Sequence, residues 1–164
     1  MKLVGFSDAD WGSSEDHKSI SGYYFTLNNG AAISWKSKRQ STVALSSCES
    51  EYVAMTVATR EGLYLSQLLG DLVENGVVSN PLVDTSGFEL FADNQGAISL
   101  TKNPVLHQRS KHFDLKLHFI RDLVDKKLVK ISYVPTEDNV SDLMTKPFTK
   151  LKIQKFGRWL FGKL

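Results

Sequence analysis

The spacing of apolar and polar residues predicts strands in the first part of the chain. Three segments rich in aromatic and β-branched residues predict strands over 3–8, 21–27 and 31–36. Asn28-Asn29-Gly30 separates the second segment from the third, and Asn and Gly tolerate the positive φ that a tight hairpin demands. The chain is therefore expected to open with an antiparallel meander.

The pattern then changes to the helical period of about 3.6 residues. The segment 46–73 has no Pro and many good helix formers, with Ser46 or Ser47 able to cap its start and Asn75-Gly76 placed to end it. Further along, the pattern predicts a strand over 89–92, a short helix from Asn94, a long helix over 112–127, a strand over 129–134, a helix from near Asn139 and a last helix over about 151–161.

This order of elements favours an α/β fold. Three strands in a meander, followed by strands reached through helices, imply a mixed sheet with helices packed on it. The length of 164 residues and the hydrophobic content of 41% suit a single domain over 1–164. The helix over about 151–161 is expected to pack on the same core.

Composition narrows the classes of partner. The formal net charge is only +2, so any basic surface has to be local. Cys48 is the single cysteine, which excludes an internal disulfide and favours a reducing, intracellular compartment. No apolar run approaches the roughly 20 residues needed to cross a membrane, so no membrane partner is expected. The oligomeric state stays open, because the sequence has no obvious exposed apolar seam.

Two acids stand at the carboxyl ends of predicted strands. Asp8 ends the strand over 3–8, and Asp93 directly follows the strand over 89–92. Ligand sites gather at the carboxyl ends of strands in sheets of this kind. If the two strands are parallel neighbours, the two carboxylates converge. The alternative for Asp93 is an ordinary helix N-cap, where Asp is a preferred residue.

The long helix supplies a third acid, and the helical period selects which one. At 100° per residue, Glu51 shares a face with apolar and small residues, whereas Glu49 falls on the opposite side. A Glu on a core-facing stripe is costly unless it is paired or bound to a metal. The alternative is a Glu at the rim of the stripe with access to water.

Asp142 is a fourth candidate, although an Asp in a first helical turn also simply suits the helix dipole. Several gathered carboxylates would repel each other, and divalent cations remove that repulsion. Mg²⁺ prefers hard oxygen ligands, and two such ions can activate a water and stabilise the leaving oxygen in phosphodiester cleavage. No cysteine–histidine cluster indicates zinc, and the chain has neither a P-loop nor a dinucleotide fingerprint.

Four blocks of sequence carry a family resemblance: GFSDADWGSSEDHKSISGYYFTL, AISWKSKRQSTVALSSCESEYVAM, ADNQGAISLTKNPVLHQRSKHFDLKLHFIRD and VPTEDNVSDLMTKP. In this order they resemble the ribonuclease H domain of copia-type LTR retrotransposon polyproteins, which follows the reverse transcriptase. The resemblance implies a ribonuclease H-like fold, with a five-stranded mixed sheet and helices on both faces. It also implies hydrolysis of the RNA strand of RNA–DNA hybrids during reverse transcription, with two Mg²⁺ ions or Mn²⁺ as a substitute.

Carried over residue by residue, the resemblance makes Asp8, Glu51, Asp93 and Asp142 the catalytic and metal-binding acids. Asp8 would bridge both metals, and Asp142 would hold the metal that carries the attacking water. Asp10 is the runner-up for the first position, because alternation turns it to the same face as Asp8. The implied partners are the RNA–DNA hybrid and the reverse transcriptase domain of the same polyprotein, and the implied location is a cytoplasmic virus-like particle.

Basic residues beside an aromatic side chain predict substrate contacts. In ISWKSKRQ, cationic groups next to an indole can hold phosphates and stack on a sugar or base. The alternative is a solvated strand end. The predicted substrate-binding residues are Trp35, Lys36, Lys38, Arg39, Arg109, Lys111 and His112. The roles of His112, Asp114, His118 and Arg121 stay open between helix-surface positions and contacts with hybrid or reverse transcriptase.

Two features depart from the family pattern. Cellular ribonucleases H carry a His in the loop before the last Asp, whereas the loop PTEDN has none. Either Glu137 or Asp138 substitutes for that His, or turnover is slower. Many relatives also have a basic protrusion between helices that grips the hybrid. No such insertion stands between Leu100 and Phe113, so the grip would depend on a neighbouring domain.

Two other functions compete with this interpretation. A DDE-type integrase or transposase uses the same fold, but it places its Glu on a late helix, unlike Glu51. Strand transfer on duplex DNA would identify such an enzyme. A non-catalytic module supporting a reverse transcriptase is the second rival, and the presence of all four acids argues against it.

Overall fold

Five strands form one sheet in the computed structural model, which describes residues 2–28, 30–78, 84, 86–102, 111–147 and 149–162, apart from the side chains of residues 111, 112 and 158. The strands are β1 (Leu3–Asp10), β2 (Ile20–Leu27), β3 (Ala32–Arg39), β4 (Phe88–Ala92) and β5 (Val129–Tyr133). The helices are α1 (Ser47–Glu74), α2 (Gln95–Lys102), α3 (Lys111–Asp125) and α4 (Lys150–Phe161), with short 3₁₀ helices η1 (Thr136–Asp138) and η2 (Val140–Met144).

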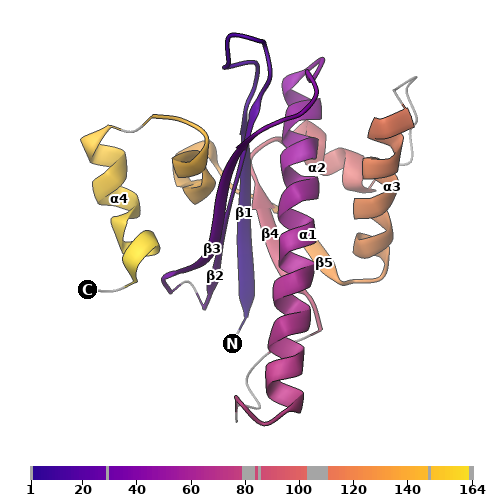
Figure 1. The fold of residues 1–164 in the computed structure, drawn as a ribbon, viewed down its shortest axis with the longest axis vertical. Helices are drawn as coiled ribbons and strands as arrows, with labels where there is room; N and C mark the ends of the chain where they lie inside the picture. The colour runs from indigo at the N-terminus through magenta and orange to yellow at the C-terminus, as the bar shows by residue number, and fades with distance from the viewer. Residues whose placement is uncertain are drawn as a thin grey trace.

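The sheet is mixed and has β1 at its centre. Its order is β3-β2-β1-β4-β5. The first three strands pair antiparallel, as a meander does, whereas β4 pairs parallel to β1 and β5 parallel to β4. The parallel strands are reached through α1, α2 and α3, which lie on one face of the sheet, and α4 covers the other face (Figure 1). The predicted α/β architecture, a five-stranded mixed sheet with helices on both faces, is therefore confirmed.

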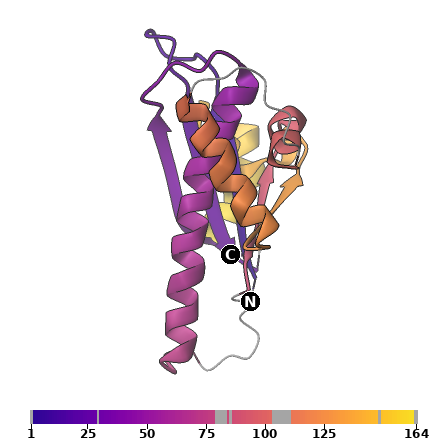
Figure 2. The ribbon, with the colours of Figure 1, turned by 90° about the vertical axis from the view of Figure 1, so that its right-hand side faces the viewer.

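Helix α1 lies close against one face of the sheet because the residues it turns inward are small. Ala54, Ala58 and Gly62 are all buried there. A Cβ placed on Gly62 would come within 2.3 Å of the ring of Phe88, so only glycine fits at that crossing. Helix α3 packs beside α1, and α1 continues past the lower end of the sheet (Figure 2). Within the described residues, no helix is both long and apolar enough to span a membrane.

The opposite face of the sheet has its own apolar cluster, built around α4. Phe156 of α4 is 1% exposed and packs with Phe6 and Tyr24 from the sheet and Val140 from η2. The hydroxyl of Tyr24 donates to the backbone carbonyl of Trp159, which fastens α4 to the sheet. The last helix therefore packs against the sheet, on the face opposite α1.

Two strands extend further than the sequence predicts, and one predicted helix has another form. Strand β1 runs on to Asp10, because its antiparallel pairing with β2 continues after its parallel pairing with β4 has ended. Strand β3 runs on to Arg39 because its partner Ile20 is still in β2. The helix expected near Asn139 is the 3₁₀ turn η2, capped by the Asn139 side chain.

Candidate active site

Asp8 and Asp93 meet at the edge of the sheet where the pairing of β1 with β4 stops. That pairing ends with Phe6 opposite Phe91. Continuing the same register by two residues on each chain sets Asp8 beside Asp93. Asp8, Glu51 and Asp93 each offer a carboxylate oxygen within 4.8 Å of the other two. The structure thus brings together three of the four acids that the sequence singles out.

Asp93 is not the N-cap of α2. The side-chain oxygen of Asn94 accepts the N–H of Ala97 at 2.9 Å, and its backbone carbonyl accepts the N–H of Ile98 at 3.0 Å. Asn94 therefore caps the helix in the usual way. The carboxylate of Asp93 instead faces Asp8 and Glu51. The alternative that Asp93 serves as a helix N-cap is therefore excluded.

Capping contacts at the start of α1 orient Glu51. Ser46 accepts the N–H of Glu49 at 3.1 Å, and Glu49 accepts the N–H of Leu45 at 2.9 Å, an arrangement close to a capping box. With the first turn fixed this way, Glu51 faces the sheet and is only 7% exposed. Among the described residues, no donor reaches its Oε2 atom. The Glu49 side chain, by contrast, takes part in the helix cap by accepting the N–H of Leu45.

Burial governs the ionisation of these acids. Desolvation raises the pKa of Glu51 to about 9, with the charges of Asp8 and Asp93 adding to the effect. Burial likewise raises the pKa of Asp8 to about 6, although a hydrogen bond from the Thr145 hydroxyl and the charge of Lys146 oppose it. A cation bound among these oxygens would favour their ionised forms.

Asp142 lies on η2, which is held against β1. The side-chain amide of Asn139 donates to the carbonyl of Ser7 at 3.0 Å. A Cβ on Gly22 would lie 2.6 Å from Cβ of Met144, so the absence of a side chain lets η2 approach the sheet. Asp142 is fully buried as a result.

Two lysines neutralise Asp142. Lys146 Nζ lies 2.6 Å from its Oδ1 and Lys152 Nζ lies 2.5 Å from its Oδ2. Burial on its own would raise the pKa of Asp142, but the hydrogen bonds and charges of the two lysines outweigh burial and hold that pKa below its usual range. Lys146 Nζ also lies 3.4 Å from Oδ2 of Asp8, so it links two of the four acids.

The donor set fits a hard divalent cation. The acidic cluster of the described residues consists of carboxylates alone, which are the ligands that Mg²⁺ and Mn²⁺ prefer. Oε2 of Glu51 is a buried acceptor for which the protein supplies no donor. A buried carboxylate oxygen without a partner is costly, and coordination of a cation removes that cost.

The predicted basic cluster on β3 is divided between the two faces of the sheet. Lys36 pairs with Tyr23, which faces α1, whereas Trp35 pairs with Tyr24, which faces α4. Trp35 is 60% exposed on its side. The indole therefore does not stand over the same surface as Lys36 and Lys38. Arg39 forms an ion pair with Asp16 at 3.2 Å.

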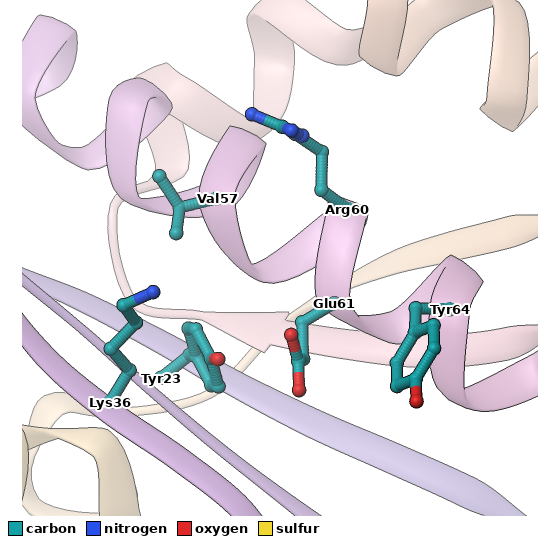
Figure 3. Close-up of a pocket in the computed structure, with 6 residues that line it drawn as sticks. All are labelled: Tyr23, Lys36, Val57, Arg60, Glu61 and Tyr64. Atoms are coloured by element: carbon teal, nitrogen blue, oxygen red, sulfur yellow. The ribbon is translucent and has the colours of Figure 1, made fainter.

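Lys36 lines a groove between β3 and α1. One hollow of about 320 Å³ is lined by Tyr23, Lys36, Val57, Arg60, Glu61 and Tyr64 (Figure 3). In Figure 3 Glu61 stands between the two tyrosines, and the guanidinium of Arg60 points away from them. An adjoining hollow of about 180 Å³ shares Tyr23, Lys36 and Val57 and adds Lys38, Arg39 and Lys116. The second hollow carries the local positive charge.

The remaining predicted residues are placed only in part. Arg109 lies outside the described residues, as do the side chains of Lys111 and His112. His118 is exposed on α3. Arg121 donates to the carbonyl of Leu100 at 2.8 Å, which ties α3 to the end of α2 and is a structural contact. Asp10 is half-buried and stands outside the group of three acids.

Sequence reasoning missed the residues that surround the acids. Thr145 and Lys146 follow Asp142 in SDLMTK, and the four-residue spacing of Lys146 from Asp142 could have indicated an ion pair. Lys152 gave no such signal, because it comes from α4, a separate element.

The chain is similar in sequence to a segment of retrotransposon Pol polyproteins. Over 153 residues it is 39% identical to the retrovirus-related Pol polyprotein from transposon TNT 1-94 of Nicotiana tabacum, covering 93% of this chain. Over 160 residues it is 38% identical to the Pol polyprotein from transposon RE2 of Arabidopsis thaliana, covering 96% of this chain. The chain spans about a tenth of the length of these curated relatives, 11% and 10% respectively. No protein-family model matches the chain.

Solved structures agree on the fold. LC11-RNase H1, isolated from compost, superposes with a TM-score of 0.60 at 15% identity, covering 88% of this chain and 92% of that one. The structure of LC11-RNase H1 in complex with an RNA/DNA hybrid gives a TM-score of 0.57 at 18% identity, covering 88% and 94%. The chain is thus a ribonuclease H-fold domain of the copia-type retrotransposon Pol polyprotein family.

Proposed function

We propose that this domain is a divalent-metal-dependent ribonuclease that hydrolyses the RNA strand of RNA–DNA hybrids. The observation that carries the proposal is the convergence of Asp8, Glu51 and Asp93 around a buried Glu51 oxygen that has no protein donor. The likeness to a ribonuclease H solved with an RNA/DNA hybrid supports the choice of substrate.

The four acids would hold two Mg²⁺ ions, for which Mn²⁺ would substitute. Asp8, Glu51 and Asp93 would hold the first, and Asp8 would share the second with Asp142. When bound, such ions activate a water and stabilise the leaving oxygen of a phosphodiester. The protein's own part is to fix the oxygens: Thr145 holds Asp8, the capped start of α1 holds Glu51, and Asn139 holds the turn that carries Asp142.

The basic hollow beside β3 would hold the sugar–phosphate backbone of the hybrid. Lys36, Lys38 and Lys116 border it, and charge contacts of this kind recognise phosphates whatever the base sequence. The hollow in Figure 3 is a poorer candidate, because Glu61 occupies its middle and accepts a hydrogen bond from Ser34 at 2.6 Å. The reverse transcriptase segment of the same polyprotein is the proposed protein partner, with reverse transcription inside virus-like particles as the setting.

The proposal is tested by offering the domain four labelled substrates with Mg²⁺: RNA–DNA hybrid, duplex RNA, duplex DNA and single-stranded RNA. Cleavage of the hybrid alone is expected, with loss of cleavage in Asp8→Asn. Asp10→Asn is the matched control, since Asp10 lies on the same strand and outside the acidic group.

Two results would contradict the proposal. Strand transfer on duplex DNA would identify a DDE-type transferase instead. Absence of hybrid cleavage, both alone and fused to an upstream reverse transcriptase segment, would identify a non-catalytic module.

A further inference from the structure

The four acids of the candidate site have unequal partners. On one side, Oε2 of Glu51 meets no donor among the described residues. On the other, both oxygens of Asp142 accept ammonium groups, from Lys146 at 2.6 Å and Lys152 at 2.5 Å. Lys146 also reaches Asp8 at 3.4 Å. Asp142 and one oxygen of Asp8 therefore already contact a positive charge, whereas Oε2 of Glu51 has no protein donor among the described residues.

We propose that Lys146 competes with the second divalent cation for Oδ2 of Asp8 and Oδ1 of Asp142, so that the site takes up its two cations in a fixed order. The inference rests on the proposed two-cation function. The first cation is held by Asp8, Glu51 and Asp93 and requires no oxygen of Asp142. The second requires Lys146 to leave both carboxylates. Lys146 is thus a positioning residue that keeps Asp8 and Asp142 together until that cation arrives.

The local structure permits this exchange. Lys146 lies four residues after Asp142 and two residues beyond the end of η2, and its side chain is 34% exposed, so the ammonium can move out into water. The side chains of Asp8 and Asp142 are each only 1% exposed and stay where the Thr145 and Asn139 contacts hold them. The exchange therefore moves a flexible cation between fixed oxygens.

Lys152 provides the comparison that separates competition from simple repulsion between charges. Its ammonium contacts Asp142 but is not among the partners of Asp8, and it comes from α4 rather than from the turn itself. Removing either lysine deletes one positive charge next to Asp142. Only the removal of Lys146 frees one oxygen of Asp8 and one oxygen of Asp142.

The test is a titration of the metal-free chain with Mn²⁺, in which free Mn²⁺ is followed by electron paramagnetic resonance without any substrate. Wild type is expected to show one stronger and one weaker site. Lys146→Gln should strengthen the weaker site by about tenfold and leave the stronger site within about twofold. Lys152→Gln should strengthen it clearly less. Lys126→Gln should change neither, because Lys126 forms a four-residue-spaced pair with Asp122 on α3, away from the site.

A second readout follows the lysine itself. The side-chain ¹⁵Nζ signal of Lys146, assigned by its loss in Lys146→Gln, should be protected from exchange in the metal-free protein. When a cation fills the weaker site, this signal should be lost because the ammonium protons then exchange rapidly with water. A Lys146 signal unaffected by saturating Mg²⁺ would overturn the inference.

Failure of this inference can be told apart from failure of the proposed function. Equal effects of Lys146→Gln and Lys152→Gln, or an unchanged weaker site, would overturn the competition even in a chain that cleaves hybrid. If the chain shows the predicted order of cation binding but cleaves no hybrid, the competition by Lys146 stands and the proposed ribonuclease function is contradicted.

Discussion

At the scale of single residues, burial decides what each carboxylate does. Glu49 and Glu51 lie two positions apart on α1, yet one closes a helix cap and the other reaches the acidic cluster. The helical period separated them in advance, because it turns Glu51 toward the sheet. The period could not foresee that Glu49 would accept the N–H of Leu45, since that contact depends on the path of the preceding loop.

Replacement of Glu51 should separate function from stability. Glu51→Gln is expected to lower hybrid cleavage at least about 100-fold, because a ligand oxygen loses its charge. The metal-free protein should melt no lower than wild type, since the pKa of Glu51 is raised to about 9 and the residue is already neutral near pH 7. Cleavage rates and calorimetric melting check the two parts. Glu49→Gln is the matched control and should keep cleavage, and equal losses in both variants would contradict the assignment.

Glu89 should make stability depend on acid, well away from the acidic cluster. Burial opposes its ionisation, but hydrogen bonds from Lys130, Ser132 and Lys2 outweigh burial and lower the pKa of Glu89 to about 2. The folded protein therefore favours the ionised form. Its contribution is fully present above the ordinary pKa of about 4.5 and is lost as the pH falls through about 2.

Glu89→Gln tests that contribution. Near pH 7 it should lower the free energy of unfolding by about 1–2 kcal/mol, and the difference from wild type should vanish near pH 2. Urea unfolding between pH 2 and pH 7 measures it. A difference that stays constant over this range would show that the ion pairs contribute nothing.

At the scale of elements, close packing on the sheet positions the site. Helix α1 must lie near β1 for Glu51 to reach Asp8, and small residues on its inner face permit that approach. The sequence predicted the strands and long helices well, because their apolar residues repeat with clear periods. It misplaced the ends of β1 and β3, where pairing with β2 rather than local pattern decides the boundary. The 3₁₀ form of η2 was also missed, since it follows from contacts of Asn139 with Ser141 and with β1.

Two glycines of α1 test the packing. Gly62→Ala should lower the free energy of unfolding by about 1–3 kcal/mol, because its methyl group would collide with the ring of Phe88. Gly70→Ala should instead raise it by about 0.5–1 kcal/mol, since nothing lies within 4 Å and alanine is the better helix former. Chemical denaturation measures both. A stabilising Gly62→Ala would show that α1 does not need to approach the sheet so closely.

At the scale of the whole molecule, α4 closes the face of the sheet opposite α1 and reaches the acids through Lys152. The sequence predicted that this helix would pack on the core. The sequence prediction grouped Trp35 with Lys36 and Lys38, although the alternation of side chains along a strand already puts Trp35 on the opposite face of the sheet. The sequence could not show Lys152 beside Asp142, since contacts between separate elements leave no local period.

Two phenylalanines of α4 measure what the helix contributes. Phe156→Ala should cost about 3–5 kcal/mol of stability, because Phe156 is 1% exposed and its loss leaves a cavity. Phe161→Ala should change stability by less than about 0.5 kcal/mol, since Phe161 is 72% exposed. Thermal unfolding followed by circular dichroism compares them. Equal effects would mean that α4 does not cover the sheet as described.

The central position of β1 in the sheet also determines how late in its synthesis the domain can finish folding. Within this domain β1 is synthesised before its partners: one of its edges pairs with β2, which follows closely, whereas the other pairs with β4, and Ser7 accepts from Asn139, 132 residues later. Contacts over such separations form slowly. A nascent chain halted before β4 can form the meander and α1, but Asp8 then has neither Asp93 nor Asp142 beside it. The proposed nuclease chemistry could therefore begin only after nearly the whole domain has been translated.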